Sequence, residues 1–166
     1  MFNAFSPGEY QPVVNPIHII GIGSPFGDDQ LGWQIVDALE HSSSLPASWQ
    51  SVSFIKADRP GINLLELMRD CDTVIIVDAM KSGAPAGTIR RFDDAEIEQN
   101  DIPLSSHGFG VAAALTLARA LDQMPKTLVL YGIEADSTDH PESRKIDSAI
   151  NDLTRKISAE LVMLQL

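Results

Sequence analysis

Four residues that can bind a metal ion stand where predicted strands end or predicted helices begin. Asp28 and Asp29 follow an apolar run and a glycine-containing turn. Asp78 ends a second apolar run, and His107 precedes a helical pattern. If both runs are parallel strands of one sheet, these side chains share the edge at which open α/β sheets bind ligands. Carboxylates and an imidazole form a plausible ligand set for a divalent transition metal such as nickel or zinc.

Each of these residues also has a structural interpretation. Asp28 is a good N-cap for the helix predicted after it, and Asp29 suits the positive end of that helix, together contributing about 1–2 kcal/mol. An Asp after a strand often forms a turn. A lone His is more often structural than a ligand, so His107 is favoured only because of the acids expected beside it.

The turn does not match the common nucleotide-binding motifs. A dinucleotide fingerprint needs a third glycine after Gly21 and Gly23, and the acid pair that follows would repel a pyrophosphate. No Gly-Lys-Ser/Thr follows, so the turn is not a P-loop. The sequence also lacks a His-Glu-x-x-His helix and a Gly-x-Ser-x-Gly elbow. Ser105 and Ser106 only adjoin His107 in sequence, which rarely makes a working Ser-His pair.

The elements that must position these residues alternate between strand and helix. Apolar runs predict strands that begin at Ile17 and span Val52–Lys56, Thr73–Met80 and Thr127–Ile133, with a weaker edge strand at Thr88–Phe92. Helical spacing predicts helices over Leu31–Leu39, Ile62–Arg69, Phe109–Leu121 and Ile146–Leu164. This order predicts an α/β fold, a three-layer sandwich with a mostly parallel twisted sheet and helices on both faces.

Length and composition predict one domain and exclude several kinds of partner. The chain has 166 residues, which predicts an irregular lead-in over residues 1–16 and a single domain over residues 17–166. Its formal net charge of −11 argues against nucleic acid and anionic membrane as partners. No apolar run reaches the roughly 20 residues that a membrane span needs. We expect a monomer or a weak oligomer.

The lone cysteine indicates a reducing compartment. Cys71 cannot form an intramolecular disulfide or a thiolate metal cluster, so the cytoplasm is the expected location. The segment Met1–Asn15 lacks the basic and apolar regions of a signal peptide. Because Cys71 precedes the strand that ends at Asp78, we expect a buried structural thiol at the opposite edge of the sheet.

Three segments, in this order and spacing, resemble the [NiFe]-hydrogenase maturation endopeptidases. They are GIGSPFGDDQLGWQIVDAL, VIIVDAM and SSHGFGVAAALTLARAL, a specific combination of individually weak motifs. The segment TLVLYGIEAD resembles the last strand and loop of that family. The resemblance covers most of the chain, from Ile17 to Ile133.

The resemblance implies a fold, an activity and a set of site residues. Members of the family remove a C-terminal extension from the precursor of the hydrogenase large subunit after nickel has been inserted. The metal-contacting and catalytic positions carry over by motif to Asp29, Asp78 and His107. Asp28 matches the acid beside the first ligand, as a cap or a supporting neighbour. The nickel is implied to belong to the precursor rather than to the free enzyme.

The chain departs from the family pattern in two regions. The first of the three segments is one residue shorter than is usual in the family between Gly23 and Asp28. It also has Ser24 where Asn is usual and Gln30 where Gly is common. After the second strand, residues 56–61 replace an acid followed by Gly-Gly-Thr. That loop is linked to substrate choice in the family, so the type of hydrogenase served stays open.

Two other hypotheses remain beside the endopeptidase. A non-catalytic module could use the same three residues to bind nickel or the precursor without cutting. An acidic nucleotide-binding α/β domain would share the predicted fold. In the endopeptidase, a metal-polarised water or a water activated by a carboxylate could attack the peptide, and the sequence does not assign the nucleophile.

Overall fold

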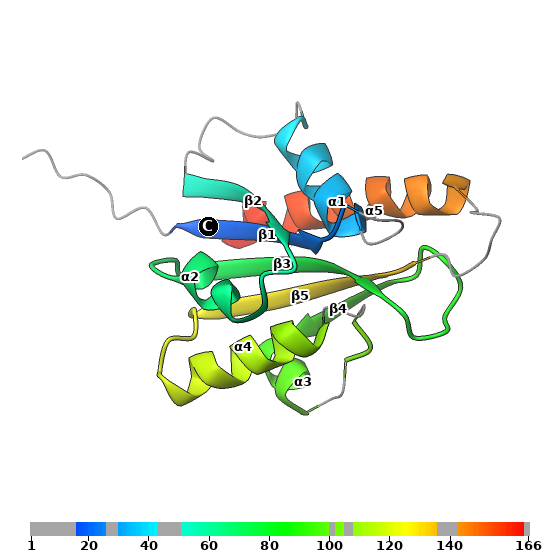
Figure 1. Cartoon of the computed structure of the whole chain (residues 1–166). Helices are drawn as coiled ribbons and strands as arrows, with labels where there is room; N and C mark the ends of the chain where they lie inside the picture. The colour runs from blue at the N-terminus through cyan, green and yellow to red at the C-terminus, as the bar shows by residue number, and fades with distance from the viewer. Residues whose placement is uncertain are drawn as a thin grey trace, which may run out of the picture.

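The centre of the molecule is a five-stranded sheet in the order β2-β1-β3-β5-β4. The structure, a computed structural model, describes residues 16–25, 30–42, 51–99, 102–104, 108–135 and 143–164. The strands are β1 (Ile17–Gly23), β2 (Val52–Asp58), β3 (Thr73–Met80), β4 (Ile89–Asp93) and β5 (Thr127–Glu134). The pairs β1–β2, β1–β3 and β3–β5 are parallel, and β4 pairs with β5 in the antiparallel direction. The mostly parallel sheet and its edge strand are therefore confirmed (Figure 1).

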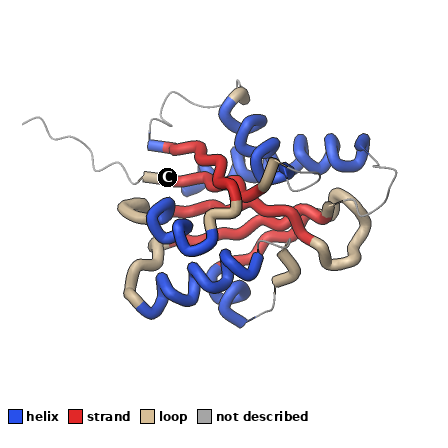
Figure 2. The backbone as a smooth tube through the Cα atoms, in the orientation of Figure 1, coloured by secondary structure: helices blue, strands red, loops and turns tan. Residues whose placement is uncertain are grey.

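Helices cover both faces of the sheet. They are α1 (Leu31–Glu40), α2 (Leu64–Met68) with the 3₁₀ turn η3 (Gly61–Asn63) before it, α3 (Asp94–Gln99), α4 (Gly108–Ala120) and α5 (Ser143–Leu164). The helices α1 and α5 pack on one face, while α2 and α4 pack on the other (Figures 1 and 2). The predicted three-layer α/β sandwich is thus the fold of this chain.

Strand β3 lies in the middle of the sheet, and all eight of its residues are buried. Its odd-numbered residues Ile75, Val77 and Ala79 face the core beneath α1 and α5. Its even-numbered residues Val74, Ile76 and Met80 face the core beneath α2 and α4. Because a strand buried on both faces is mostly apolar on both sides, the continuous run Val74–Val77 predicted this place correctly.

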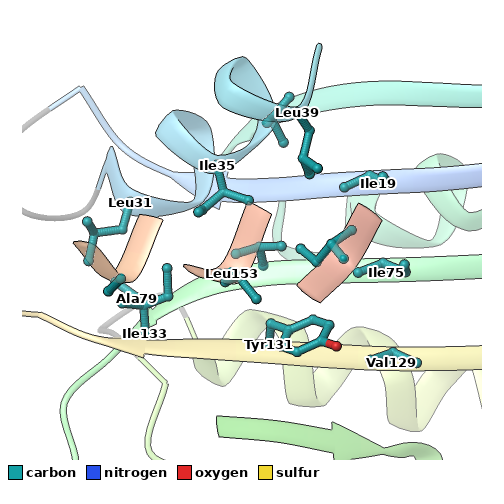
Figure 3. Packing of buried hydrophobic residues seen from close by; sticks show 14 of the residues in the cluster. Ile19, Leu31, Ile35, Leu39, Ile75, Ala79, Val129, Tyr131, Ile133 and Leu153 are labelled. Atoms are coloured by element: carbon teal, nitrogen blue, oxygen red, sulfur yellow. The ribbon is translucent and has the colours of Figure 1, made fainter. Parts of the chain in front are cut away.

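The first of these two cores is formed by α1 and α5 on one face of the sheet. Leu31, Ile35 and Leu39 of α1 and Leu153 of α5 pack there against strand residues such as Ile75 (Figure 3). Their spacing of three to four residues puts them on one helical face. This packing fixes the first turn of α1 against the sheet, directly after the loop that contains Asp28 and Asp29.

Several predicted boundaries differ from the structure. The N-cap of α1 is Gln30, without a side-chain cap hydrogen bond, while Asp28, considered as a cap, lies outside the described residues. The predicted helix over residues 62–69 is a 3₁₀ turn followed by a shorter α-helix, because a Pro-Gly pair precedes it. At the end of α5, Leu164 is exposed rather than part of the buried stripe.

Some predictions fall outside the described residues. They include the predicted lead-in over residues 1–16, of which the structure describes Pro16 alone. Among the helices that the structure describes, none has both the length and the apolar character needed to cross a membrane.

Candidate functional site

Asp78 is a buried carboxylate near the carboxyl end of the central strand. Its side chain is 1% exposed, and its Oδ1 accepts a hydrogen bond of 2.7 Å from the backbone N–H of Ala79. As an even-numbered residue of β3, Asp78 belongs to the face that α2 and α4 cover. Burying a carboxylate costs free energy unless specific partners compensate for it, so such a residue at a ligand-binding edge is a candidate site residue.

The strand order puts Asp78 beside the point where the chain reverses its direction across the sheet. From β1 the chain crosses to β2 on one side, and it then returns to β3 on the other side of β1. In open α/β sheets, ligands bind outside the carboxyl ends of the two strands that flank such a point. Here these strands are β1, which leads into the acid-containing loop, and β3, which contains Asp78.

The loop after β1 is anchored at both ends at this edge. Ser24 is buried directly after the strand, and the Gln30 side chain donates a hydrogen bond of 3.1 Å to the Pro25 carbonyl. Gly32 lies so close to the sheet that a Cβ there would stand 2.2 Å from the Ile22 carbonyl oxygen and 2.6 Å from that of Val77. The first turn of α1 therefore rests on β1 and β3, one residue from Asp78.

The loop after β2 joins the same edge. The Arg59 N–H donates a hydrogen bond of 3.1 Å to the Gly23 carbonyl, and the Arg59 guanidinium pairs with Asp58. That hydrogen-bonded pair raises the pKa of Arg59. Gly61 meets α4, because a Cβ at Gly110 would lie 3.0 Å from the Gly61 Cα. The first turn of α4 is thus held beside the ends of β1 and β2.

The segment before α4 pairs with the end of β3. Leu104 forms an isolated antiparallel bridge with Met80, and the Lys81 N–H donates a hydrogen bond of 2.9 Å to the Pro103 carbonyl. Met80 is two residues beyond Asp78. Residues 103 and 104 are therefore held beside the end of β3.

Of the predicted site residues, the structure describes Asp78 alone. Asp28, Asp29, His107 and the serines before His107 lie outside the described residues. Among the residues that are described, no three His, Cys, Asp or Glu side chains form a metal-binding group. Of the described residues beside these gaps, Leu104 is bridged to Met80, and Gln30 directly precedes the first turn of α1, which rests on β1 and β3.

The remaining described histidines have structural partners. The ring Nδ1 of His18 lies 2.7 Å from the Leu67 carbonyl oxygen, and that of His41 lies 2.8 Å from the Asp37 carbonyl oxygen. Cys71 is buried before β3, at the opposite edge of the sheet, as expected. The structural interpretation of these three residues is therefore supported.

Glu134 was missed as a buried residue. The predicted strand ended one residue earlier, at Ile133, whereas Glu134 is the last residue of β5 and is 3% exposed. Its inward position continues the alternation of Leu128, Leu130 and Gly132, which was the available signal. A second buried carboxylate therefore lies on the strand next to that of Asp78.

This edge is suited to cation binding and to general acid–base chemistry. A carboxylate such as Asp78 can bind a divalent cation or take a proton from a water molecule. The described residues just after β1, β2 and β3 lie at this edge together with residues 103 and 104, so a ligand there would lie near several elements.

Comparison with known proteins identifies the family. A sequence model described as hydrogenase maturation protease matches residues 33–160, which is more than half of the chain. The chain belongs to the hydrogenase maturation protease family. The Hydrogenase 2 maturation protease of Escherichia coli strain K12 is 33% identical over 129 residues, covering 74% of this chain and 75% of that protein. The HupD protein of Thiocapsa roseopersicina is 29% identical over 126 residues, and that match spans 74% of this chain but only 56% of HupD.

Solved structures of maturation proteases share the fold. The hydrogenase maturating endopeptidase HybD of E. coli superimposes with a TM-score of 0.74 at 28% identity, covering 89% of this chain and 93% of that one. The [NiFe]-hydrogenase maturation protease HybD of Thermococcus kodakarensis gives a TM-score of 0.67 at 19% identity, covering 88% and 98%. The E. coli relative and both solved structures are named as proteases or endopeptidases, whereas HupD is named a hydrogenase expression/formation protein. The α/β fold of this chain is that of the solved structures.

Proposed function

We propose that this maturation protease removes the C-terminal extension from the precursor of a [NiFe]-hydrogenase large subunit after nickel insertion. We further propose that Asp29, Asp78 and His107 contact the nickel ion that the precursor presents. The nickel is then part of the substrate, and the contact both positions the scissile peptide and tests whether the metal has been loaded. We expect the protein to act in the cytoplasm as a monomer or a weak oligomer.

The burial of Asp78 is the observation that supports this proposal most directly. A carboxylate that is 1% exposed sits at the carboxyl end of the central strand, on the side covered by α4. At the described ends of the two gaps, the first turn of α1 rests on β1 and β3, and Leu104 is bridged to Met80, two residues beyond Asp78. Two carboxylates and an imidazole match the oxygen and nitrogen donors that a divalent transition metal accepts.

The residues of the chain have defined tasks in this proposal. Asp78 and Asp29 supply negative charge at the metal, while the neutral imidazole of His107 supplies a nitrogen donor. Hydrolysis adds water across the peptide bond, so one of the carboxylates can take the water proton while the amine leaves. The rigid sheet edge limits how far the peptide can move relative to these groups.

Processing of a nickel-loaded precursor tests the proposal. The substrate is a large-subunit precursor with its C-terminal extension, and the product is detected by mass spectrometry as a shortened subunit. We expect His107→Ala and Asp78→Asn to abolish processing. Matched controls are His41→Ala and Asp122→Asn, because these residues are exposed and lie outside the site. The controls should process the precursor at the wild-type rate.

Stability measurements separate this function from the structural alternatives. His107→Ala should change the melting temperature by no more than a few degrees, because we propose that the ring contacts substrate rather than the core. A large loss of melting temperature would instead identify His107 as a core residue. Asp28→Asn should reduce processing less than Asp29→Asn if Asp28 is only a supporting neighbour.

Two outcomes would replace the proposed function. Wild-type protein that binds the nickel-loaded precursor without shortening it would be a non-catalytic binding module. A nucleotide that raises the melting temperature at saturating concentration would support the nucleotide-binding alternative, and the absence of any shift would eliminate it.

A further inference from the structure

The buried carboxylate of Glu134 accepts hydrogen bonds from the start of the loop that follows β3. Its Oε1 accepts hydrogen bonds from the N–H groups of Ser82, at 2.8 Å, and Gly83, at 2.9 Å. Its Oε2 accepts one from the Ser82 hydroxyl at 2.7 Å and one from the Ser82 N–H at 3.1 Å. Two successive backbone N–H groups that point at one carboxylate form a small anion-binding nest, here filled by the protein itself.

The backbone of Glu134 holds the other end of the same loop. Its N–H donates to the Thr88 carbonyl at 2.8 Å, and its carbonyl accepts from the Gly87 N–H at 2.9 Å. The side chain of Glu134 therefore holds the start of the loop formed by residues 82–88, and its main chain holds the end of that loop.

This loop begins where β3 supports the segment that leads into α4. Met80 is bridged to Leu104, and the Lys81 N–H donates to the Pro103 carbonyl. The Met80 carbonyl also accepts a hydrogen bond of 3.0 Å from the N–H of Ala135. Residues 80–83 thus connect Asp78, residues 103 and 104 before α4 and the end of β5 within a few residues of chain.

We propose that Glu134 is a positioning residue for the proposed peptidase site. Its carboxylate fixes the backbone of Ser82 and Gly83, and this fixes the end of β3 to which Pro103 and Leu104 are bonded. The inference rests on the proposed function, because it assumes that Asp78 and the start of α4 form the site. Glu134 itself does not touch the substrate in this proposal.

Two substitutions at Glu134 differ in how many of these bonds survive. Gln in place of Glu134 keeps one acceptor oxygen for the Ser82 and Gly83 N–H groups, but it puts an NH₂ group where Oε2 accepts from Ser82. Ala in place of Glu134 leaves both N–H groups without their acceptor in a buried place, which is the costlier change. A third substitution, Ser82→Ala, removes the hydrogen bond from the Ser82 hydroxyl to Oε2. It leaves the hydrogen bonds from the Ser82 and Gly83 N–H groups intact.

The experiment measures kcat and KM for shortening of the nickel-loaded precursor by the full chain. Since small displacements at a catalytic site can cost about 100-fold in rate, we expect Glu134→Ala to lose about 100-fold in kcat and Glu134→Gln about 10-fold, with KM within threefold. Ser82→Ala should lose less than Glu134→Gln. The control Glu98→Gln removes an exposed charge from α3 and should leave both constants unchanged.

Amide hydrogen exchange provides a second readout, which does not depend on activity. In Glu134→Gln the amides of Ser82 and Gly83 should exchange faster, and so should the amide of Lys81, which is bonded to Pro103. The amides of β1 in Glu134→Gln should keep their protection against exchange. This would show that Glu134→Gln is folded even if Glu134→Ala is not.

The outcomes separate this inference from the proposed function. Variants that exchange faster at residues 81–83 yet retain the wild-type kcat would reduce Glu134 to a purely structural residue and overturn the inference. A kcat loss without faster exchange at Lys81 would also overturn it, because the effect would not pass through the end of β3. Wild-type protein that fails to shorten the precursor would instead refute the proposed function.

Discussion

At the scale of single residues, the two ends of the parallel sheet differ in chemistry. Asp78 and Glu134 place two carboxylates at the carboxyl end. Cys71 places one thiol at the amino end, where it lines a cavity of about 400 Å³ with Met68 and Met124. The ionisable residues of the candidate site are thus separated from the only cysteine by the length of β3.

The Cys71 thiol should be unreactive in the folded protein. Burial, followed by the charges of Asp72 and Asp70, raises the pKa of Cys71 from 9.0 to about 11. Because the thiolate is the reactive form, this shift lowers its population about 100-fold at pH 8. We expect iodoacetamide to modify the native protein at pH 8 about 100-fold more slowly than the urea-unfolded protein.

The same reaction at higher pH provides the control for Cys71. The native rate should rise steadily up to about pH 11, as long as the protein stays folded, because the thiol loses its proton there. A native rate that levels off near pH 9 would show an ordinary pKa. In that case the thiol would be as available as one on the surface.

At the scale of elements, α1 and β1 approach each other more closely than side chains allow. A Cβ at Gly21 would lie 2.2 Å from the Gly32 carbonyl oxygen, and a Cβ at Gly32 would lie 2.2 Å from the Ile22 carbonyl oxygen. Backbone atoms cannot move aside without displacing the strand or the helix. The pair of glycines therefore sets the place of α1 and of the loop that precedes it.

Gly32→Ala should destabilise the protein by at least about 3 kcal/mol, because the added methyl group meets backbone on two strands. Urea unfolding of the purified variant measures this loss. Gln34→Ala is a matched control in the same helix, since Gln34 is exposed and should change the free energy of unfolding by less than about 0.5 kcal/mol. A Gly32→Ala protein as stable as the control would mean that α1 does not rest on β1.

At the scale of the whole molecule, the long C-terminal helix is joined to the far edge of the sheet by a polar network. The Tyr131 hydroxyl donates a hydrogen bond of 2.5 Å to Glu160 on α5, and Arg91 on β4 forms an ion pair of 2.5 Å with the same carboxylate. Burial and the bond to Glu160 raise the pKa of Tyr131 to about 12. The tyrosine therefore stays a hydrogen-bond donor throughout the neutral range.

This network makes global stability depend on pH. Burial raises the pKa of Glu160, but the hydrogen bonds from Arg91 and Tyr131 outweigh it, so the pKa lies below its ordinary value of 4.5. A lowered pKa stabilises the folded state above pH 4.5, and this contribution is lost as the pH falls through the folded-state pKa. We expect wild-type protein to exceed Glu160→Gln in stability by about 1–2 kcal/mol at pH 7 and by much less at pH 3.

Urea unfolding at several pH values measures the difference in free energy of unfolding between wild type and Glu160→Gln. The titration of all other groups cancels in this difference. Glu98→Gln on the exposed surface of α3 should show no such pH dependence. A difference between wild type and Glu160→Gln that stays constant from pH 7 to pH 3 would show that Glu160 does not stabilise the fold through its charge.

The sequence by itself determined the elements and the class of fold. The continuous apolar run Val74–Val77 predicted a strand buried on both faces, and the spacing of Leu31, Ile35 and Leu39 predicted a helix buried on one side. These patterns are local, so they are visible without the fold. The three motifs that resemble the maturation endopeptidases also stand in the sequence, and the family that they indicated is confirmed.

Only the tertiary structure decided which residues meet. Strand order puts β1 beside β3, and the bridge between Met80 and Leu104 brings the segment before α4 to the same edge. The burial of Glu134 and the close contact at Gly32 likewise depend on partners distant in the sequence. The physical reason is that hydrophobic periodicity specifies which face of an element is buried, whereas pairing register and backbone contact specify what that face is buried against.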